Sequence, residues 1–482
     1  MSDHRDMIRR RPCTALTATR GRLCALSLLA LGLLMCTLPL GERMTHAATA
    51  GSRPAADAAI RQVSIDSAGV IAYIKDDGIY TFGRGGGLRR VVAAGDEAPR
   101  AGGRFIQFLD LSSASISGPL GVQKDLRIVF KARIEGGTVD EGIFLFSENL
   151  GLAAVVLPGD TAPDTGGGAF ASFPDRPLIG SQGTIMFKAM VMGGRATEGL
   201  FFVPRQFFTG EATVGSVAIE GEPAPGTGGG AYAGFGAYDM EESTVLMGAP
   251  PLVVASAFAF VADVDGGRTP QGIFARSLFL VPEIPVRIEI QRPPTEMALA
   301  GNPPPSRALA DSVYARFEDV VLTQHELVFR AILSGGEVSE GIFQLAFLGP
   351  ITLPSPRVLQ GDLAPIVGAD VRFAQFGRMV GNNAEELVFE ATLEGDGPSQ
   401  GLFSATLGPL DLVSETLSVG DRAQGTDGGV FHALGPLAIN DDGFVAFQAK
   451  IDGGSICEGL YRELAKRARL IDGVPCTPAA SR

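Results

Sequence analysis

Acidic side chains recur in glycine-rich loops along the chain, and they are the first candidates for chemistry. One such loop reads "PGDTAPDTGGG" at residues 158–168, and each loop carries an oxygen-bearing side chain directly after a glycine. Carboxylate oxygens are the ligands that Ca²⁺ prefers. Calcium is therefore a candidate cofactor, with the aspartates of four loops as its ligands. The six loop positions are Asp96, Asp160, Glu222, Asn302, Asp362 and Asp421, and the calcium candidates among them are Asp96, Asp160, Asp362 and Asp421.

The same loops also have a purely structural interpretation, which we favour. Asp, Glu and Asn share an oxygen acceptor but not a charge, and an apolar strand pattern follows each loop where an anion site would open a helix. Proline stiffens the loop and glycine permits positive φ. We therefore expect each loop to be a turn that joins one copy of a building unit to the next, with no cofactor bound.

A second recurrent position precedes the motif "GIF" or its variants "GLF" and "GLY". Glutamine replaces glutamate there twice, so a negative charge is not required. A side-chain oxygen that accepts hydrogen bonds from the backbone satisfies all the variants. We predict this structural role for the position, which holds Asp77, Glu141, Glu198, Gln271, Glu340, Gln400 and Glu458.

Residues typical of known catalytic sites are scarce. Only His325 and His432 remain beyond residue 50, and the chain contains no HExxH, CxxC or phosphate-binding GKS/T motif. We therefore predict no catalytic residue. A pair of carboxylates working on a glycosidic bond stays open, because acids are abundant and their separation is not visible in a sequence.

The elements that position these side chains form an internal repeat. The loop glycines fall at 95, 159, 221, 301, 361 and 420, with spacings of 64, 62, 80, 60 and 59 residues. Each period contains an aromatic pair, an apolar strand such as "RIVFKA" or "ELVFRA", a glycine-rich turn, the "EGIF" strand and a last strand. The stretch before the first loop completes a seventh copy. Four short strands per copy predict an all-β, seven-bladed propeller. The alternatives are a β-solenoid and two sandwiches or barrels.

One stretch resembles a known family. "NDDGFVAF", from Asn440 through Gly443 to Phe447, is similar to the repeat of the NxxGxxAF tandem-repeat family of secreted bacterial proteins, and "DSAGVIAY" at 66–73 is a near match. The resemblance implies a repeat protein with varied C-terminal sorting anchors and no attached biochemical activity. This chain ends "IDGVPCTPAASR", without the apolar helix and basic tail of such an anchor. Asn and Gly at a hairpin turn tolerate left-handed φ, so Asn440 and Gly443 are expected to be structural.

The N-terminal 50 residues have the order of a secretory signal. Arginines are followed by an apolar run at 23–40 and by "THAATA", which favours cleavage over an uncleaved membrane anchor. We expect a signal peptide at 1–50, a short linker at 51–59, the propeller at 60–475 and a tail at 476–482. The protein would be secreted, periplasmic or in the cell envelope, with no stable membrane span after cleavage.

The charge of the chain limits the classes of partner it can bind, and its cysteines predict a disulfide. The first 50 residues hold seven arginines and three acids, so the remainder carries 33 basic against 50 acidic residues. This net negative chain repels phosphate backbones, and nucleic acid is not expected as a partner. Cys457 and Cys476 are predicted to form a disulfide, the alternative being two separate buried thiols. We predict a monomeric, non-enzymatic binding module for an extracellular protein or glycan; the alternative is a polysaccharide-active hydrolase or lyase.

Overall fold

The computed structural model describes most of the chain beyond residue 59. The described ranges are 60–83, 87–117, 124–204, 214–246, 252–281, 287–290, 293–306, 309–346, 353–408, 412–464 and 466–476. The predicted signal peptide at 1–50, the linker at 51–59 and residues 477–482 of the tail lie outside them. Within these ranges, no helix is long and apolar enough to cross a membrane.

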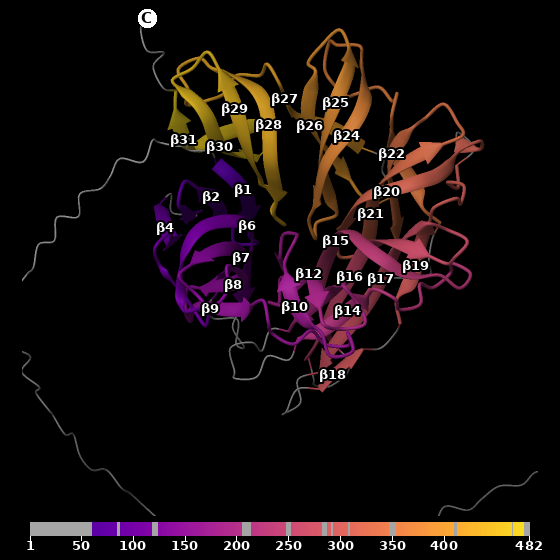
Figure 1. Cartoon of the computed structure of the whole chain (residues 1–482). Coiled ribbons are helices and arrows are strands. Elements are labelled where there is room, and N and C mark those ends of the chain that lie inside the picture. The colour runs from indigo at the N-terminus through magenta and orange to yellow at the C-terminus, as the bar shows by residue number, and fades with distance from the viewer. Residues whose placement is uncertain are drawn as a thin grey trace, which may run out of the picture. The chain divides into compact units, whose positions relative to one another are not determined.

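The predicted all-β propeller is confirmed, because the described strands form seven antiparallel sheets set around an axis (Figure 1). In each sheet the strands follow one another from the axis outward. The first three blades contain β1 (Ile60–Ile65), β2 (Ile71–Lys75), β3 (Gly78–Phe82) and β4 (Leu88–Ala93); β5 (Glu97–Ala98), β6 (Gly103–Ser117), β7 (Lys124–Glu135), β8 (Glu141–Ser147) and β9 (Gly151–Val156); and β10 (Ala169–Ser172), β11 (Leu178–Ile179), β12 (Ile185–Met192), β13 (Glu198–Val203) and β14 (Gly215–Ile219).

The remaining four blades repeat this order. They contain β15 (Ala231–Leu246), β16 (Leu252–Asp265), β17 (Gln271–Val281), β18 (Arg287–Ile290) and β19 (Thr295–Leu299); β20 (Val313–Leu322), β21 (Glu326–Ser334), β22 (Glu340–Ala346) and β23 (Ser355–Leu359); β24 (Val371–Gly381), β25 (Glu386–Gly395), β26 (Gln400–Thr406) and β27 (Leu412–Ser418); and β28 (Val430–Ile439), β29 (Val445–Asp452), β30 (Ile456–Leu464) and β31 (Arg467–Pro475).

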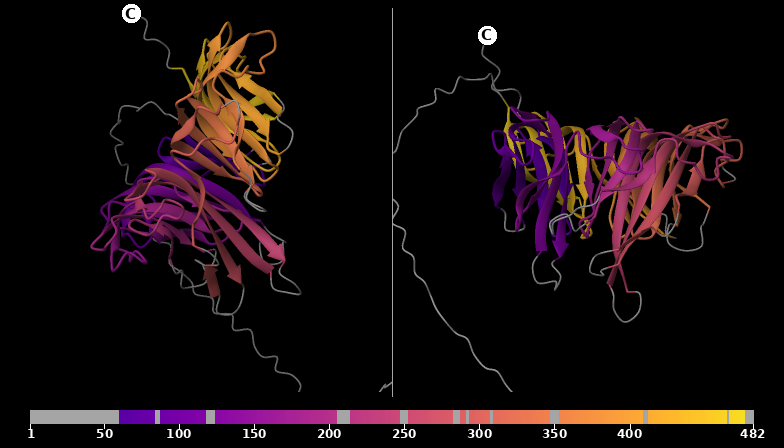
Figure 2. Two further views of the ribbon diagram at one scale, coloured as in Figure 1. Left: turned by 90° about the vertical axis from the view of Figure 1, so that its right-hand side faces the viewer. Right: turned by 60° about the horizontal axis from the view of Figure 1, so that its bottom comes forward.

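Three blades depart from the simple four-stranded plan. Blade two adds the short β5, the inner strand of blade three is split into β10 and β11, and the outer strand of blade four is split into β18 and β19. Blade four is also the longest, with 16 residues in β15 and 14 in β16. Its strands extend beyond those of its neighbours in Figure 2. This extension corresponds to the irregular fourth copy in the sequence.

The apolar core lies between the blades rather than in one central mass. Seven clusters of buried side chains each join two neighbouring blades among the described residues. The aromatic pair after each joint belongs to these clusters. Phe105, for example, meets Phe144 edge-on at a centroid distance of 4.9 Å, and Phe447 stacks on Tyr461 at 5.5 Å. All four rings are buried, so they stabilise the blades by burial and edge-to-face contact.

The ring closes without exchanging a strand. Blade one is made only of β1–β4 and blade seven only of β28–β31. Contact between β1 and the strands β28 and β29 forms the seam, which buries Ile60, Ile71 and Leu460. Polar contacts add to it: Tyr73 donates a hydrogen bond to Asp472 at 2.7 Å. The seam therefore depends on side-chain packing and a few hydrogen bonds.

Candidate functional site

The axis of the propeller is a polar channel, and it is our candidate functional site. The inner strand of most blades presents an unpaired backbone edge there, whereas β6 of blade two is also paired over two residues with the short β5. The channel contains a cavity of about 290 Å³ that all seven blades line. Concave cavities with a few converging polar groups are the usual places for ligands.

Two aspartates in the channel hold the inner strand of the following blade. Asp239 on β15 accepts a hydrogen bond from the backbone N–H of Leu322 on β20 at 2.9 Å. Asp319 on β20 accepts one from Val320 at 3.0 Å, and the backbone of Met379 on β24 also donates to it. Desolvation by the surrounding protein raises the pKa of each aspartate to about 6. Both carboxyls therefore change charge slightly below neutral pH.

Glu241, two residues after Asp239 on β15, is a third carboxyl of the channel with a raised pKa. Burial, together with the nearby carboxyls of Asp239 and Glu242, raises its pKa to about 8 against a hydrogen bond from the side chain of Asn383. Its Oε1 atom is buried and has no hydrogen-bond partner, and neither does Oδ1 of Asn383. Both oxygen atoms are closed to water, so they lie in the wall of the channel and not on its open surface.

Side-chain amides link the turns around one end of the channel. Asn440 accepts a hydrogen bond from Phe444 N at 2.9 Å within its own turn and donates from Nδ2 to the Asp66 carbonyl of blade one at 3.2 Å. Asn382 donates in the same way to the Asn440 carbonyl at 2.9 Å. Gly443 has φ of 76°, which a residue with a side chain rarely adopts. The Asn of the repeat motif therefore shapes its own turn and also binds the next blade.

The glycine-rich joints lie away from this cavity, and their acids bind their own backbone. Asp160 Oδ2 accepts the N–H of Leu157 at 2.9 Å, and Gly159 N donates to Phe170 O at 2.8 Å, which fixes the joint to the next blade. No three His, Cys, Asp or Glu residues among those described lie close enough to hold one metal ion. The equivalent contacts of Asp96, Asp362 and Asp421 each measure 2.8 Å.

The acceptors before the "GIF" motif bind the following blade. Five of the seven place a side-chain oxygen on the backbone N–H of the second aromatic residue in the next blade, or of its counterpart, and Gln271 does so as well as the glutamates. This contact explains why glutamine can replace glutamate, since only an acceptor is needed. The pairs are Glu141 with Phe173 at 3.0 Å, Glu198 with Phe235 at 2.7 Å, Gln271 with Phe317 at 2.7 Å, Glu340 with Phe376 at 3.3 Å and Glu458 with Ile60 at 2.5 Å. Asp77 lies near Arg90 and Gln400 donates to Glu390, so the predicted contact is not seen at these two positions.

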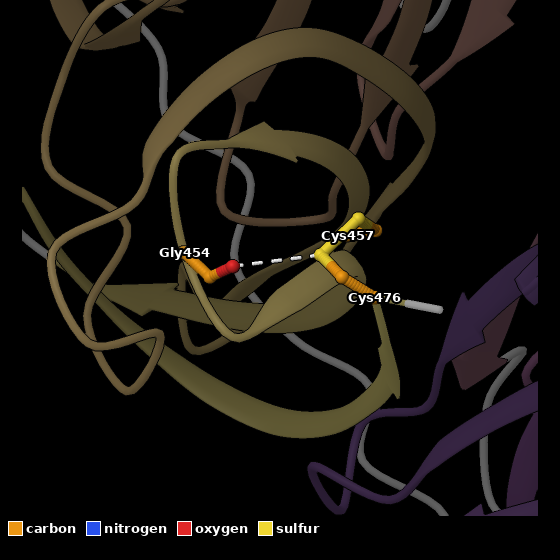
Figure 3. Close-up of a disulfide and its surroundings, with 3 residues drawn as sticks. All are labelled: Gly454, Cys457 and Cys476. Atoms are coloured by element: carbon orange, nitrogen blue, oxygen red, sulfur yellow. Dashed lines mark hydrogen bonds between the residues drawn. A yellow bond between two sulfur atoms is a disulfide. The ribbon is translucent and has the colours of Figure 1, made fainter. Parts of the chain in front are cut away.

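The predicted disulfide is confirmed. Cys457 and Cys476 are bonded with a Cα–Cα distance of 4.8 Å, and Cys457 lies within β30 rather than in the turn before it (Figure 3). The sulfur of Cys476 lies 3.5 Å from the carbonyl oxygen of Gly454, as Figure 3 also shows. The bond ties β31 to β30, the strand whose Glu458 binds β1 across the seam.

The channel carboxyls were missed by the sequence interpretation, which named no catalytic residue and placed its calcium candidates in the glycine-rich loops. Asp239 pairs with Ala259 next to Phe260, and the corresponding inner-strand positions of later blades hold Val321, Val380 and Ala438. An acid at a position that is apolar in other copies is a usable signal. This signal becomes visible when the copies are aligned on the strand after the inner strand instead of on the glycine-rich loops.

These features define the class of protein: a seven-bladed propeller of self-contained blades with an acidic axial channel. Within that class, the chain belongs to a family of unknown function, DUF7453, whose profile matches residues 66–244 and 357–463. The part between these matches contains the extended blade four. A comparison with curated proteins found no match.

Several solved structures share the general architecture. A puromycin-hydrolysing peptidase of Mycobacterium tuberculosis is 10% identical with a TM-score of 0.45, over 86% of this chain and 54% of the peptidase. A protein of unknown function from Dyadobacter fermentans is 12% identical, with a TM-score of 0.35 over 74% and 94% of the two chains. An ulvan lyase of polysaccharide lyase family PL25 is 10% identical, with a TM-score of 0.39 over 86% and 96%. This chain spans about half the length of the peptidase, and likenesses at these levels carry no functional information.

Proposed function

We propose that this protein is a secreted, non-enzymatic binding module whose ligand site is the axial channel. The observation that carries the proposal is the cavity of about 290 Å³ at the axis, which all seven blades line and in which several polar side chains converge. The ligand would be a free glycan or a group of an extracellular protein small enough to enter the cavity.

The proposed location outside the cytoplasm or in the cell envelope has two supports. The first 50 residues carry the charge, apolar and small-residue order of a cleaved signal. The disulfide between Cys457 and Cys476 suits an oxidising compartment. The resemblance to the NxxGxxAF repeat family of secreted bacterial proteins, carried by Asn440, Gly443 and Phe447, agrees with this location.

The test compares the mature chain with a variant whose channel is filled, Asn383→Trp. A glycan array and a small-molecule thermal-shift screen are run on both proteins, with the far-UV CD spectrum as the check that the variant is folded. We expect at least one ligand that binds the wild-type chain and not the variant. If every bound ligand binds the filled variant equally well, the channel is not the site.

A second candidate function is a polysaccharide-active enzyme, and one observation favours it. The carboxyls of Asp239, Asp319 and Glu241 share a cavity while their pKa values lie near 6, 6 and 8, so protonated and ionised carboxyls coexist at neutral pH. General acid and base catalysis on a glycosidic bond uses such a pair. Release of reducing ends or unsaturated products from any polymer by the wild-type chain, and its loss in Glu241→Gln, would replace the binding module with this function.

A further inference from the structure

The outer hairpin of blade seven carries a group of arginines that no other blade repeats. Arg462 on β30 stands directly opposite Arg469 on β31, and Arg467 lies on the same side of the hairpin, opposite Leu464. Like charges that face each other across a strand pair are unfavourable. None of the equivalent pairs in the other blades has two cations; they are Thr81 with Arg89, Leu145 with Ala153, Phe202 with Gly215, Ala275 with Thr295, Gln344 with Ser355 and Ser404 with Ser414.

These arginines lie on the side of blade seven that faces blade one, its neighbour in Figure 1. In β30, Tyr461 packs in the cluster shared with blade six, whereas Leu460 packs in the seam with blade one. Side chains alternate along a strand, so Arg462 follows Leu460 on the seam side.

Blade one presents apolar side chains and a further arginine to the same seam. Phe82 on β3 packs against the seam cluster, as does Tyr80. On β4, Leu88 stands opposite Phe82 and Arg90 stands opposite Tyr80, so both lie on this side of the blade. We call Arg90, Arg462, Arg467 and Arg469 the seam arginines.

The arginines of blade seven have no anionic partner among the residues that the structure describes. Arg467 and Arg469 are exposed, and the guanidinium of Arg462 lies 5.0 Å from the centre of the Phe444 ring. Cations on the other sides of the same two blades do have partners. Arg89 pairs with Glu148 of blade two at 2.9 Å, and Lys466 pairs with Glu415 of blade six at 3.3 Å.

The acids of the seam do not neutralise the group. Asp472 accepts hydrogen bonds from Tyr73 at 2.7 Å and from Lys75 at 2.8 Å, and Glu458 is engaged by the backbone of Ile60. Beyond residue 50 the chain holds 50 acidic and 33 basic residues, yet these arginines are left without an acid. A local charge conflict of this kind without a structural gain is expected where a protein binds something.

The surroundings favour the carboxylates of a carbohydrate chain over other anions. The planar guanidinium group matches a carboxylate with two parallel hydrogen bonds. Leu88 and Leu464, which are 51% and 42% exposed, offer apolar contacts to sugar rings beside the charges. A nucleic acid carries one charge per about 1.7 Å, so its dense phosphates would be repelled by the net negative remainder of the chain. An anionic membrane would meet the same repulsion over a wide surface.

We propose that the seam arginines bind the carboxylates of an acidic polysaccharide. This site lies on the outer part of the seam, is separate from the axial channel and does not depend on the function proposed for that channel. Galacturonate and mannuronate oligomers are two probes of the class, and the methyl ester of the galacturonate oligomer is its uncharged match.

The experiment is isothermal titration calorimetry on the mature chain at low and at high salt. We expect at least one acidic oligomer to bind, the methyl ester to bind at least tenfold more weakly than galacturonate where galacturonate is the ligand, and affinity to fall as salt rises. The double variant Arg467→Gln/Arg469→Gln should lose at least tenfold in affinity. Arg133→Gln/Arg268→Gln removes the same charge from exposed positions of blades two and four, and this matched control should bind as wild type.

Stability distinguishes a binding role from a structural one. The Arg467→Gln/Arg469→Gln variant relieves the like-charge pair and removes no described contact of either side chain. Its urea midpoint should therefore be no lower than that of wild type. A lower midpoint would show that the arginines serve the fold and would overturn the proposal.

The remaining results also decide the matter. Failure of both acidic oligomers to bind, equal binding of galacturonate and its ester, full affinity in the seam variant, or an equal loss in the control variant overturns the proposal. Binding of phosphatidylglycerol vesicles or of a single-stranded oligodeoxynucleotide as strong as that of the oligomers would assign the arginines to another class of polyanion and overturn it too. Loss of oligomer binding in Asn383→Trp but not in the seam variant would place the glycan in the axial channel, which supports the proposed function and contradicts this site.

Discussion

The tie between neighbouring blades can be tested at Glu141, whose contact is the simplest of the set. Its Oε1 accepts the N–H of Phe173 at 3.0 Å, from β8 of blade two to blade three. Glu141→Ala leaves that N–H without its acceptor, and Phe173 is buried. Glu141→Gln keeps the acceptor, as Gln271 does for Phe317 at 2.7 Å in blade four. We therefore expect the alanine variant to be destabilised and the glutamine variant to resemble wild type.

The magnitude follows from the hydrogen bond and from the size of the chain. Loss of one partner of a part-buried hydrogen bond is unfavourable by about 1–3 kcal/mol. The entropy of unfolding is about 2.1 cal/mol/K per residue, or roughly 0.9 kcal/mol/K for about 400 residues, so the melting temperature falls by only about 1–3 °C. Urea denaturation combined with hydrogen exchange of the Phe173 amide is therefore the better assay. Exchange at that amide should accelerate in Glu141→Ala alone.

Glu135→Ala serves as the control, because Glu135 is an exposed acid of the same blade. It should leave both the urea midpoint and the Phe173 exchange rate unchanged. If Glu141→Gln is destabilised as much as Glu141→Ala, the carboxylate charge matters and the acceptor explanation is wrong. If neither variant changes exchange at Phe173, the contact does not stabilise the joint.

Three further perturbations test other parts of the molecule. Cys457→Ser removes a cross-link over about 20 residues, which should lower stability by about 3 kcal/mol by the chain-entropy estimate. Hydrogen exchange should then accelerate first in β31 and next in β1. Two free thiols in unfolded, unreduced wild-type protein would contradict the cross-link. The pKa of Glu241 in the folded state is about 8, above the ordinary value of 4.5, so this group makes stability fall as pH rises from about 4.5 to 8. Over that pH range the melting temperature of Glu241→Gln should therefore rise relative to that of wild type. Parallel pH profiles of the two proteins would refute the raised pKa. Because Asp96 and Asp160 bind backbone N–H groups, EDTA should leave the melting temperature unchanged, and a clear rise with calcium would show a bound ion.

The repeated features of the fold could be predicted from the sequence, because each one recurs in several copies of the repeat. The joint, the aromatic pair and the acceptor before "GIF" recur in phase, and substitutions such as Gln271 for glutamate show which property the position needs. The disulfide followed from two remaining cysteines. The extra length of copy four was visible in its 80-residue spacing. The split of β10 and β11 could not be predicted, since it occurs once and depends on local pairing.

The carboxyls of the channel could not be predicted from the sequence for a related reason. Asp239 stands at a position that holds Val321, Val380 and Ala438 in the later copies, so a search for recurrence ignores it. The raised pKa values of Asp239, Glu241 and Asp319 arise from burial by strands of other blades, which no single copy reveals. Function in a symmetric repeat protein is thus to be sought where one copy differs from the rest.

The seam joins blades seven and one by the same device that joins the others. Glu458 binds the Ile60 N–H as Glu141 binds that of Phe173, and no strand crosses from one end of the chain into the sheet of the other. The order of the blades around the axis is therefore independent of where the polypeptide is cut. A circular permutant that links residue 476 to residue 60 and opens at the joint between β14 and β15 preserves every sheet intact, and it should fold to the same ring.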